Sequence, residues 1–482
     1  MSRVLQPFLV TVVTTLVLQG CHEPLRPVST EAADRGILAA RVTTGDPAGR
    51  HLVVFAAERV PADFGERVAQ LGGSVETLLD SIGVASVTGL SSDAARELAA
   101  SADTRAVEPD PITQAPDAEE SAGEAADASA LDVNASPDAT ASPMSAQFYA
   151  RQWNLRAVFA PDAWAAGFLG SRDVVVAILD TGIDYSNADL AGLVDLDRSI
   201  SLVPEDVTRH YPGRLPFSDL FWHGTAVASA VASNARVLAG INRYVTLLAV
   251  KVADSTNSHT IGRIMSGIVY AADHGADVIN VSRGSERHKS QSPGVIAAYE
   301  RVVNYAFRKG ALVVSVPFND AADLDHNGDI VRLPCEAANA ICAAATGPTA
   351  GSSVNGPWVD VDAPAPYTAF GRSAVSVAAP GGAGEVGQFR RFWVLCTTTP
   401  SATTGAPACR AHQPIAQGAG TSFAAPTVAG LAALLVAQLG HGNPALIRAR
   451  ILQSADDLGE PGTDPYYGRG RINVARALAL IP

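Results

Sequence analysis

Basic residues are scarce in this chain of 482 residues. It contains 35 Lys and Arg against 48 Asp and Glu, which gives a formal net charge of −13 at pH 7. Proteins that bind nucleic acid neutralise its phosphates with clustered Lys and Arg. A nucleic-acid partner is therefore not expected. Hydrophobic residues are plentiful by contrast, at 47% of the chain, which is enough for a large core. The length predicts two to three domains.

Cysteine is also rare, with five residues in the whole chain. Setting aside Cys21 leaves an even number, which allows three disulfide pairings. Sequence proximity favours Cys335–Cys342 and Cys396–Cys409, and buried free thiols are the alternative. Neither spacing resembles a zinc ligand pair. Oxidised pairs would indicate export to the periplasm or the cell exterior.

The first apolar segment, residues 4–18, is short for a membrane-spanning helix. It follows Arg3 and ends in Leu18-Gln19-Gly20-Cys21, an arrangement typical of an export signal. This ending resembles the lipobox of bacterial lipoproteins, in which the cysteine is lipidated and becomes the first mature residue. Because His22 follows instead of aspartate, the resemblance implies an outer-membrane lipoprotein held at the membrane by its acyl chains. An ordinary signal peptide with an incidental cysteine is the alternative.

Lys and Arg are absent from residues 114–146, which contain seven Asp and Glu and are rich in Ala, Ser and Pro. Such a composition cannot bury enough apolar surface to order itself. We expect residues 115–146 to be an acidic, disordered linker. The expected organisation is a signal over residues 1–21, a small domain over residues 37–114, this linker, and a large domain over residues 147–482.

Three short motifs in the large domain contain an acid, a base and a nucleophile. Asp180 ends the apolar run 174–179, His223 begins a small-residue helix, and Ser422 begins an apolar helix that reaches about residue 439. A buried strand would hold Asp180 rigidly at the edge of a sheet. A serine at a helix N-terminus lies near N–H groups that help to bind an oxyanion. Each motif alone also suits a turn, loop or helix cap, so their order in the chain carries the inference.

These motifs, Asp180-Thr181-Gly182, His223-Gly224-Thr225 and Gly420-Thr421-Ser422, resemble those of the subtilisin-like serine proteases. The similarity extends over about residues 152–477. It implies an α/β fold with a doubly wound, mostly parallel sheet, and hydrolysis of peptide bonds without a cofactor. In that chemistry Ser422 attacks the carbonyl, His223 accepts its proton, and Asp180 orients the imidazole.

By the same resemblance, Asn319 after the strand-like run 312–316 stabilises the oxyanion with its side-chain amide. Such a donor is worth about 3–4 kcal/mol in this class of enzyme. An ordinary turn asparagine is the alternative. The family has small residues before this asparagine, whereas this chain has Pro317-Phe318.

The resemblance also implies two backbone edges that bind an extended substrate. They are Ser282-Arg283-Gly284 and Val316-Pro317-Phe318. Phe318 would shorten the pocket for the residue before the scissile bond, so we expect small or medium apolar side chains there. The side chain of Arg283 is expected to face solvent.

The small domain combines the strands 51–55 and 84–90 with the helices 63–71 and 94–100, the second capped by Ser92 or Asp93. This pattern resembles the inhibitor-type propeptide of the same proteases, an α/β sandwich that assists folding and then blocks the cleft. An unrelated accessory domain is the alternative. If the resemblance holds, the protease cuts itself in or near the linker, between about residues 116 and 152.

One segment resembles the start of an EF-hand calcium loop. Asp323, Asp325, Asn327 and Asp329 alternate, and Gly328 occupies the sixth position. Pro334 stands at the twelfth position, where the EF-hand has its bidentate glutamate, and no flanking pair of helices is evident. A structural calcium site and a polar turn are both consistent with this pattern.

Together these features predict an exported serine endopeptidase, in the cell envelope or extracellular, that cleaves proteins or peptides and is inhibited by its own propeptide. Two alternatives are a transpeptidase that passes the acyl group to an amine, and a catalytically silent binding protein on the same fold. The intact set of acid, base and nucleophile argues against silence.

Overall fold

The computed structural model describes residues 41–42, 49–114, 119–121, 142–384, 389–397 and 415–481. Cys21 and the predicted signal lie outside these residues, as do Cys409 and most of the predicted linker.

The large domain is organised around a seven-stranded sheet in which every pairing is parallel. Its strands are buried on both faces, which explains why they are almost continuously apolar. In spatial order they are β19 (Val377–Pro380), β16 (Ile341–Thr346), β14 (Leu312–Ser315), β12 (Val278–Val281), β8 (Gly170–Asp180), β10 (Tyr244–Lys251) and β9 (Ile200–Ser201).

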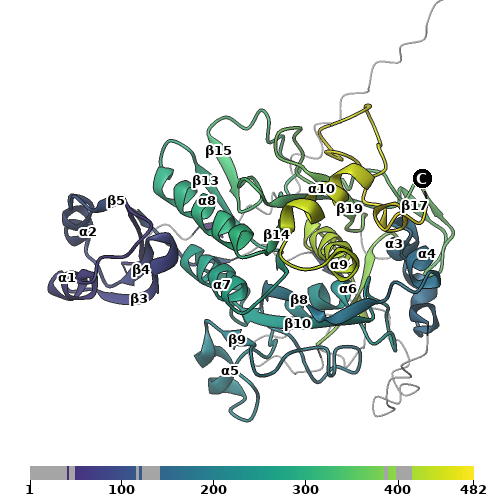
Figure 1. The fold of residues 1–482 in the computed structure, drawn as a ribbon, viewed down its shortest axis with the longest axis horizontal. Coiled ribbons are helices and arrows are strands. Elements are labelled where there is room, and N and C mark those ends of the chain that lie inside the picture. Colours follow the sequence, from purple (N-terminus) through teal and green to yellow (C-terminus); the bar gives the residue numbers. More distant parts are fainter. Residues whose placement is uncertain are drawn as a thin grey trace, which may run out of the picture. The chain divides into compact units, whose positions relative to one another are not determined.

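Helices cover both faces of this sheet (Figure 1). Helices α6 (His223–Val231) and α9 (Thr421–Leu439) pack on one face, and α7 (Ile261–Asp273) and α8 (Pro293–Arg308) on the other. Side chains alternate along a strand. Residues 174, 176 and 178 of β8 therefore join the first core, and residues 175, 177 and 179 join the second.

Helix α9 is apolar around its whole circumference because it lies in the core. Among the described residues it is the one helix long and apolar enough to cross a membrane, but 83% of its most apolar 18-residue stretch is buried within the protein. We assign it as a core helix.

Smaller elements complete the large domain. They are the helices α3 (Trp153–Ala157), α4 (Ala160–Ala165), α5 (Pro204–His210), α10 (Pro444–Ser454) and α11 (Val474–Ala477), the antiparallel pairs β13 (Ser285–His288) with β15 (Ile330–Leu333) and β17 (Ala350–Gly351) with β18 (Trp358–Val359), and the strands β20 (Phe392–Leu395) and β21 (Ile415–Ala419).

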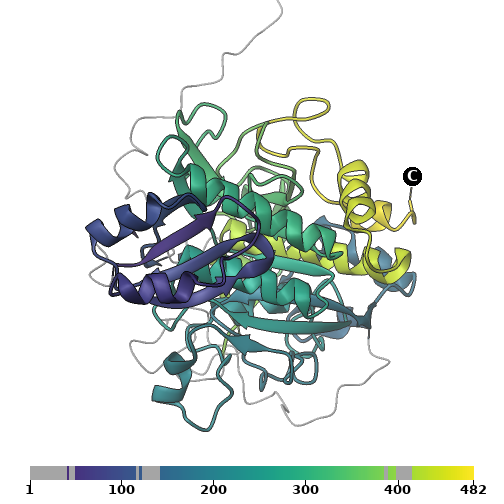
Figure 2. The same ribbon diagram turned by 60° about the vertical axis from the view of Figure 1, so that its left-hand side comes forward.

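Residues 49–114 form a small α/β domain with an antiparallel sheet in the order β3-β4-β2-β5 (Figure 2). The strands are β2 (His51–Phe55), β3 (Ser74–Leu79), β4 (Val84–Thr88) and β5 (Thr104–Pro109), and the helices are α1 (Phe64–Gln70) and α2 (Ser92–Ala99). The predicted cap of α2 is wrong by one residue, because Ser91 Oγ accepts the hydrogen bond from Ala94 N.

The two faces of this small sheet have different partners. One face packs on α1 and α2 through Phe55 and its neighbours. The other face, with Leu52 and Val54, belongs to the same core as α7 and α8. Glu108 accepts hydrogen bonds from the first turn of α8, and Asp110 from the first turn of α7.

The chain that leaves the small domain pairs with strands of the large domain. Strand β6 (Thr113–Gln114) is antiparallel to β11 (Ser258–His259) on one side and to β1 (Arg41–Val42) on the other. Strand β7 (Glu119–Ser121) is antiparallel to β21.

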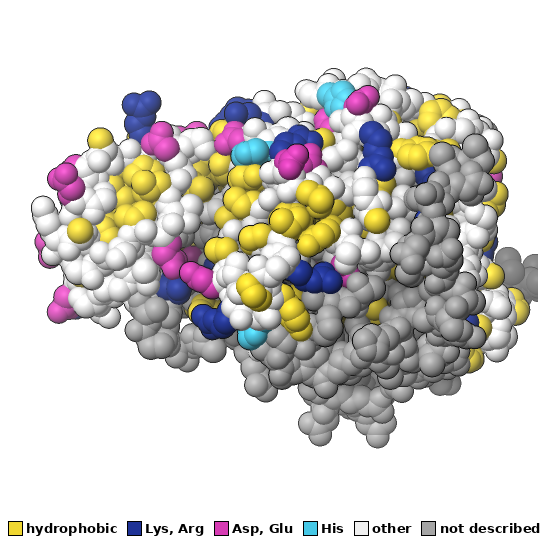
Figure 3. Space-filling model, turned by 90° about the horizontal axis from the view of Figure 1, so that it is seen from below, with side chains coloured by type: hydrophobic (Ala, Val, Ile, Leu, Met, Phe, Trp, Pro, Cys, Tyr) yellow, Lys and Arg dark blue, Asp and Glu magenta, His cyan; other side chains and the backbone are white. Residues whose placement is uncertain are grey.

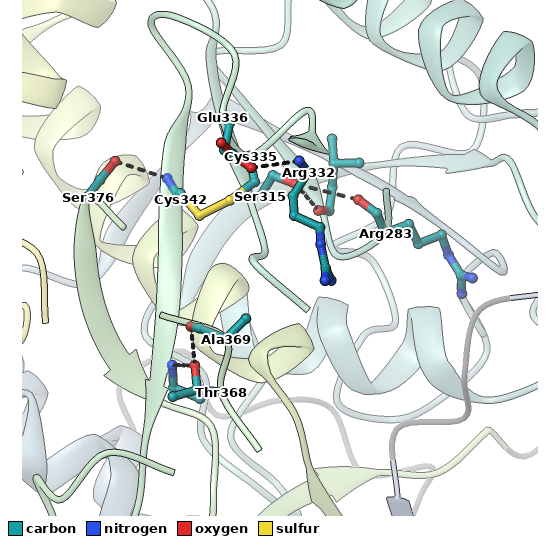
Figure 4. Close-up of a disulfide and its surroundings, with 11 residues drawn as sticks. Arg283, Ser315, Arg332, Cys335, Glu336, Cys342, Thr368, Ala369 and Ser376 are labelled. Atoms are coloured by element: carbon teal, nitrogen blue, oxygen red, sulfur yellow. Dashed lines mark hydrogen bonds between the residues drawn. A yellow bond between two sulfur atoms is a disulfide. The ribbon is translucent and has the colours of Figure 1, made fainter. Parts of the chain in front are cut away.

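Cys335 and Cys342 are joined by a disulfide, the pair that sequence proximity favoured. Figure 4 shows it beside Ser315 and Arg332. It ties the segment after β15 to the start of β16. Cys396 is also disulfide-bonded, and its expected partner lies outside the described residues.

The large apolar side chains that are exposed are spread along the chain, the most exposed being Val359 at 57% and Leu78 at 54%. Figure 3 shows apolar side chains in small groups among acidic and basic ones on one face. Exposure of this kind is ordinary for a folded protein.

Candidate active site

The acid and the base meet at the end of β8. Asp180 is its last residue, and His223 is the first residue of α6. His223 Nδ1 lies 2.8 Å from Asp180 Oδ1 and 3.0 Å from Oδ2, and both side chains are buried. The glycine after the histidine permits this approach, since a Cβ on Gly224 would lie 2.0 Å from the carbonyl oxygen of Gly182. Gly182 is required for a separate reason, because its φ is 108° and a Cβ there would lie 2.4 Å from the carbonyl oxygen of Phe217.

Asp180 Oδ1 has two further donors. Thr181 N donates at 2.7 Å, and Arg283 Nη2 donates at 2.7 Å. The expectation that Arg283 faces solvent is wrong, because its side chain is 1% exposed. Strand β12 is the parallel neighbour of β8. Residues that follow the two strands therefore meet at the same edge of the sheet, which brings Arg283 to Asp180.

The charge of Asp180 is determined by this surrounding. Burial alone would raise the pKa of its carboxyl, but the charges and hydrogen bonds of Arg283 and His223 outweigh burial and hold that pKa well below its usual range. Asp180 is therefore an anion at neutral pH.

Ser422 is the second residue of α9. Its Oγ lies 3.5 Å from the carbonyl oxygen of Ser282, while Ser282 Oγ donates to the carbonyl oxygen of Ser422 at 3.0 Å. The ring of the next residue, Phe423, is 6.2 Å from the ring of His223. In the described part of the chain no hydrogen bond joins Ser422 Oγ to His223. Catalytic hydrogen bonds are often long without substrate.

Asn319 lies beside the same serine. The preceding residue, Phe318, has φ 81°, a left-handed conformation that costs energy for a non-glycine residue. Asn319 Oδ1 accepts hydrogen bonds from Thr421 N at 2.9 Å and Thr421 Oγ1 at 2.8 Å. The amide is thus oriented by the residue directly before Ser422, and its Nδ2 has no protein acceptor among the described residues.

The two predicted pocket edges are adjacent. Phe318 packs on Gly284 so closely that a Cβ there would lie 3.0 Å from Phe318 Cε1 and 2.4 Å from the carbonyl oxygen of Leu333. On its other side the Phe318 ring meets the guanidinium of Arg332, 4.8 Å from the ring centroid. Val316 and Pro317 are buried beside it.

Sequence reasoning missed Arg332. Its side chain is 4% exposed and pairs with Asp320 and Glu286, each at 2.7 Å. It also missed β11 as the strand that pairs with β6; among the described pairings, β6 makes none with residues 282–284. Neither Arg332 nor β11 carries a sequence motif, so only the fold brings them to the site.

The side chains of the calcium-like segment are not brought together. Asp325 accepts hydrogen bonds from Arg372 N and Ser373 N, Asp329 from Ser290 N, and Asp323 contacts His326. Within the described ranges, no group of three or more His, Cys, Asp or Glu is arranged to hold a metal ion.

Comparison with known proteins agrees with this fold. The model of the subtilase family matches residues 171–470. Thermitase from Thermoactinomyces vulgaris is 32% identical over 344 residues, covering 70% of this chain and 99% of that protein. A thermophilic serine proteinase from Bacillus sp. (strain AK1) is 33% identical over 315 residues, covering 64% of this chain and 62% of that protein.

Solved structures show the same fold. The epidermin leader peptide processing serine protease from Staphylococcus aureus superposes with a TM-score of 0.66 at 20% identity, over 90% of this chain and 98% of that chain. Fervidolysin from Fervidobacterium pennivorans superposes with a TM-score of 0.64 at 21% identity, over 90% of this chain and 61% of that chain. The chain belongs to the subtilase family. It is a subtilisin-like serine endopeptidase, a hydrolase that needs no cofactor for catalysis, and the predicted parallel α/β fold is confirmed.

Proposed function

We propose that this protease is made as a self-inhibited proenzyme and hydrolyses peptide bonds through an acyl-enzyme on Ser422. The observation that carries the proposal is the buried Asp180–His223 pair, 2.8 Å apart, beside the helix that begins with Ser422. His223 takes the proton of Ser422 and later gives it to the leaving amine. Asp180 keeps the imidazole in the required tautomer and stabilises the imidazolium.

The oxyanion is stabilised by Asn319 Nδ2 together with the backbone N–H of Ser422. This role is supported by the two hydrogen bonds from Thr421 that orient the amide. A preorganised donor of this kind acts only when charge develops on the substrate oxygen. Asn319→Ala should lower kcat by about 100-fold or more with KM little changed, and an unchanged kcat would contradict the assignment.

The small domain is the inhibitor. It reaches the large domain through β6 on β11 and β7 on β21, and β21 ends at Ala419, three residues before Ser422. Glu119 therefore belongs to a strand beside the segment that leads to the nucleophile, and Gln114 belongs to a strand beside β11, whose His259 lies 3.3 Å from the carbonyl oxygen of Gly284. A peptide bound across a protease cleft places its scissile bond at the nucleophile. We expect the cut between Gln114 and Glu119, at the start of the interval that the linker predicts.

N-terminal sequencing of the mature protein tests both that the protease cuts itself and where the cut falls. Ser422→Ala should accumulate as a full-length, folded precursor, because it loses the nucleophile but no capping hydrogen bond, since the N-cap of α9 is Gly420. The wild type should give a mature N-terminus within residues 115–119. Maturation of Ser422→Ala to the same N-terminus, in cells lacking other proteases, would show that another enzyme makes the cut.

The pocket for the residue before the scissile bond accepts small or medium apolar side chains. The support is the Phe318 ring, which packs between Gly284 and Arg332 where a longer pocket would extend. Phe318→Gly suits the left-handed backbone at that position. It should increase cleavage after Phe or Leu relative to Ala at least tenfold in a peptide library. Strong cleavage after Phe, Tyr or Arg by the wild type would overturn this specificity.

The protein is exported and held at the cell envelope by a lipid on Cys21. The support is the motif at residues 18–21 together with the disulfide between Cys335 and Cys342, which indicates an oxidising compartment. Cys21→Ser should move the protein from the membrane fraction to the soluble fraction or block its processing. Unchanged membrane fractionation would favour an ordinary signal peptide.

A further inference from the structure

Arg283 is a buried cation in direct contact with the triad carboxylate. Its Nη2 donates to Asp180 Oδ1 at 2.7 Å and lies 3.5 Å from His223 Nδ1. Asp180 Oδ1 thus receives Arg283, Thr181 N and His223 Nδ1 together. A hydrogen bond between two charged groups is shorter and stronger than a neutral one. Any change at Arg283 must therefore alter how Asp180 holds the histidine.

The other end of the guanidinium is anchored near the strand that binds the peptide. Arg283 Nη1 donates to Asn257 Oδ1, and Asn257 is 2% exposed with φ 64°. The next two residues, Ser258 and His259, form β11, which pairs with β6. The chain of contacts therefore runs from the peptide-binding strand through Asn257 and Arg283 to Asp180.

The other ionisable groups near Asp180 and Arg283 have other partners or carry no charge. Lys251 donates to the carbonyl oxygen of Thr181 and pairs with Asp206 at 3.1 Å. His259 is neutral, because burial and the neighbouring charge of Arg283 lower its pKa to about 3. Arg263 lies further out, on α7. Arg283 is thus the cation that acts on Asp180 directly.

We propose that Arg283 is a positioning residue of the catalytic triad, which holds Asp180 against His223 and couples it to the peptide-binding strand through Asn257. This inference rests on the proposed triad. A carboxylate held by several charge-assisted donors keeps one position, and the imidazole that it contacts is thereby held for proton transfer. Loss of the guanidinium should therefore slow the chemical step more than it weakens substrate binding.

The test is the separate measurement of kcat and KM for peptide hydrolysis by the mature enzyme, with the rate of fluorophosphonate labelling of Ser422 as a second readout. In Arg283→Met kcat and the labelling rate should each fall at least about tenfold with KM little changed. In Arg283→Lys, which keeps the charge but not the fork geometry, kcat should fall by about threefold. Arg287→Met, a matched loss of charge on β13, should leave kcat, KM and labelling unchanged.

A folded Arg283→Met enzyme with wild-type kcat would overturn the proposal, as would a loss that appears in KM alone. If Arg283→Met does not fold, Arg283→Lys and Asn257→Gly decide. Asn257→Gly suits the left-handed backbone, keeps the charge and removes the anchor, so kcat should fall at least about threefold with KM little changed. Wild-type kcat in both variants would overturn the proposal. Labelling retained by Asp180→Asn or His223→Ala would instead show that the triad assignment has failed.

Discussion

Two buried carboxylates, Asp180 in the active site and Asp110 between the small and large domains, have opposite environments. Both are at most 2% exposed, and both accept hydrogen bonds from backbone N–H groups. Asp180 also contacts Arg283 and His223. Among the residues that the structure describes, the hydrogen-bond donors to Asp110 are Ile261 N at 2.7 Å and Gly262 N at 3.0 Å.

The consequence is a difference in pKa. Burial raises the pKa of Asp110 to about 6, since the two backbone hydrogen bonds only partly offset it. The same burial at Asp180 is outweighed by Arg283 and His223, which keep that pKa far below its usual range. The Asp110 carboxyl therefore takes up a proton as the pH falls toward 6, whereas Arg283 and His223 keep Asp180 ionised well below that pH. The domain contact titrates in a range where Asp180 does not.

Removing the catalytic charge should have the largest effect. We expect Asp180→Asn to lower kcat by about 10⁴-fold, the loss found when a triad aspartate is neutralised. Arg283 would be left as an unpaired buried charge, which should cost about 3–5 kcal/mol of stability. Peptide hydrolysis and urea unfolding measure the two effects, with Asp197→Asn, at an exposed aspartate of the large domain, as the control. Retention of a tenth of the activity would contradict the assignment.

The stability that Asp110 contributes should fall as the pH rises, which is the opposite of what a carboxylate in an ordinary ion pair does. Its pKa in the folded precursor, about 6, is above the value of 3.8 expected when it is exposed. Its contribution is therefore complete below about pH 4 and is lost as the pH rises through 6. Across this window it amounts to about 3 kcal/mol.

The Ser422→Ala precursor allows this measurement without self-cleavage. Its free energy of unfolding in urea, compared with that of Ser422→Ala/Asp110→Asn, should fall between pH 4 and pH 7. An asparagine cannot titrate, so the double variant lacks this component. A difference that stays constant over the range would show that Asp110 is not the titrating group.

The smallest effect is expected at the neighbouring carboxylate. Glu108 accepts hydrogen bonds from Gly294 N at 2.7 Å and Val295 N at 2.9 Å, in the first turn of α8. Glu108→Ala removes a helix-capping contact and should destabilise the Ser422→Ala precursor by about 1 kcal/mol. Glu97→Ala, an exposed glutamate on α2, is the matched control. Equal stability of the two variants would mean that Glu108 does not stabilise the docked domain.

Much of the large domain could be predicted from the sequence because its signals are local. The run 174–179 is apolar because a central parallel strand is buried on both faces, and Asp180 ends β8 as expected. Helix α9 begins at Thr421 and places Ser422 in its first turn, as its apolar pattern predicts. The disulfide of Cys335 and Cys342 joins residues that are close in sequence. Each of these features depends mainly on neighbours along the chain.

The remaining features depended on which strands are adjacent in space. Arg283 stands in an ordinary loop sequence, and only the pairing of β12 with β8 brings it to Asp180. Arg332 reaches Phe318 from strand β15, which pairs with β13, and Asp110 meets α7 from another domain. The calcium-like spacing of Asp323 and Asp325 did not predict a shared site, because their oxygens bind separate partners. The sequence determined the catalytic residue types and the strands and helices that carry them. The tertiary structure decided which charges are buried together, because electrostatic energies depend on distance through space and on burial.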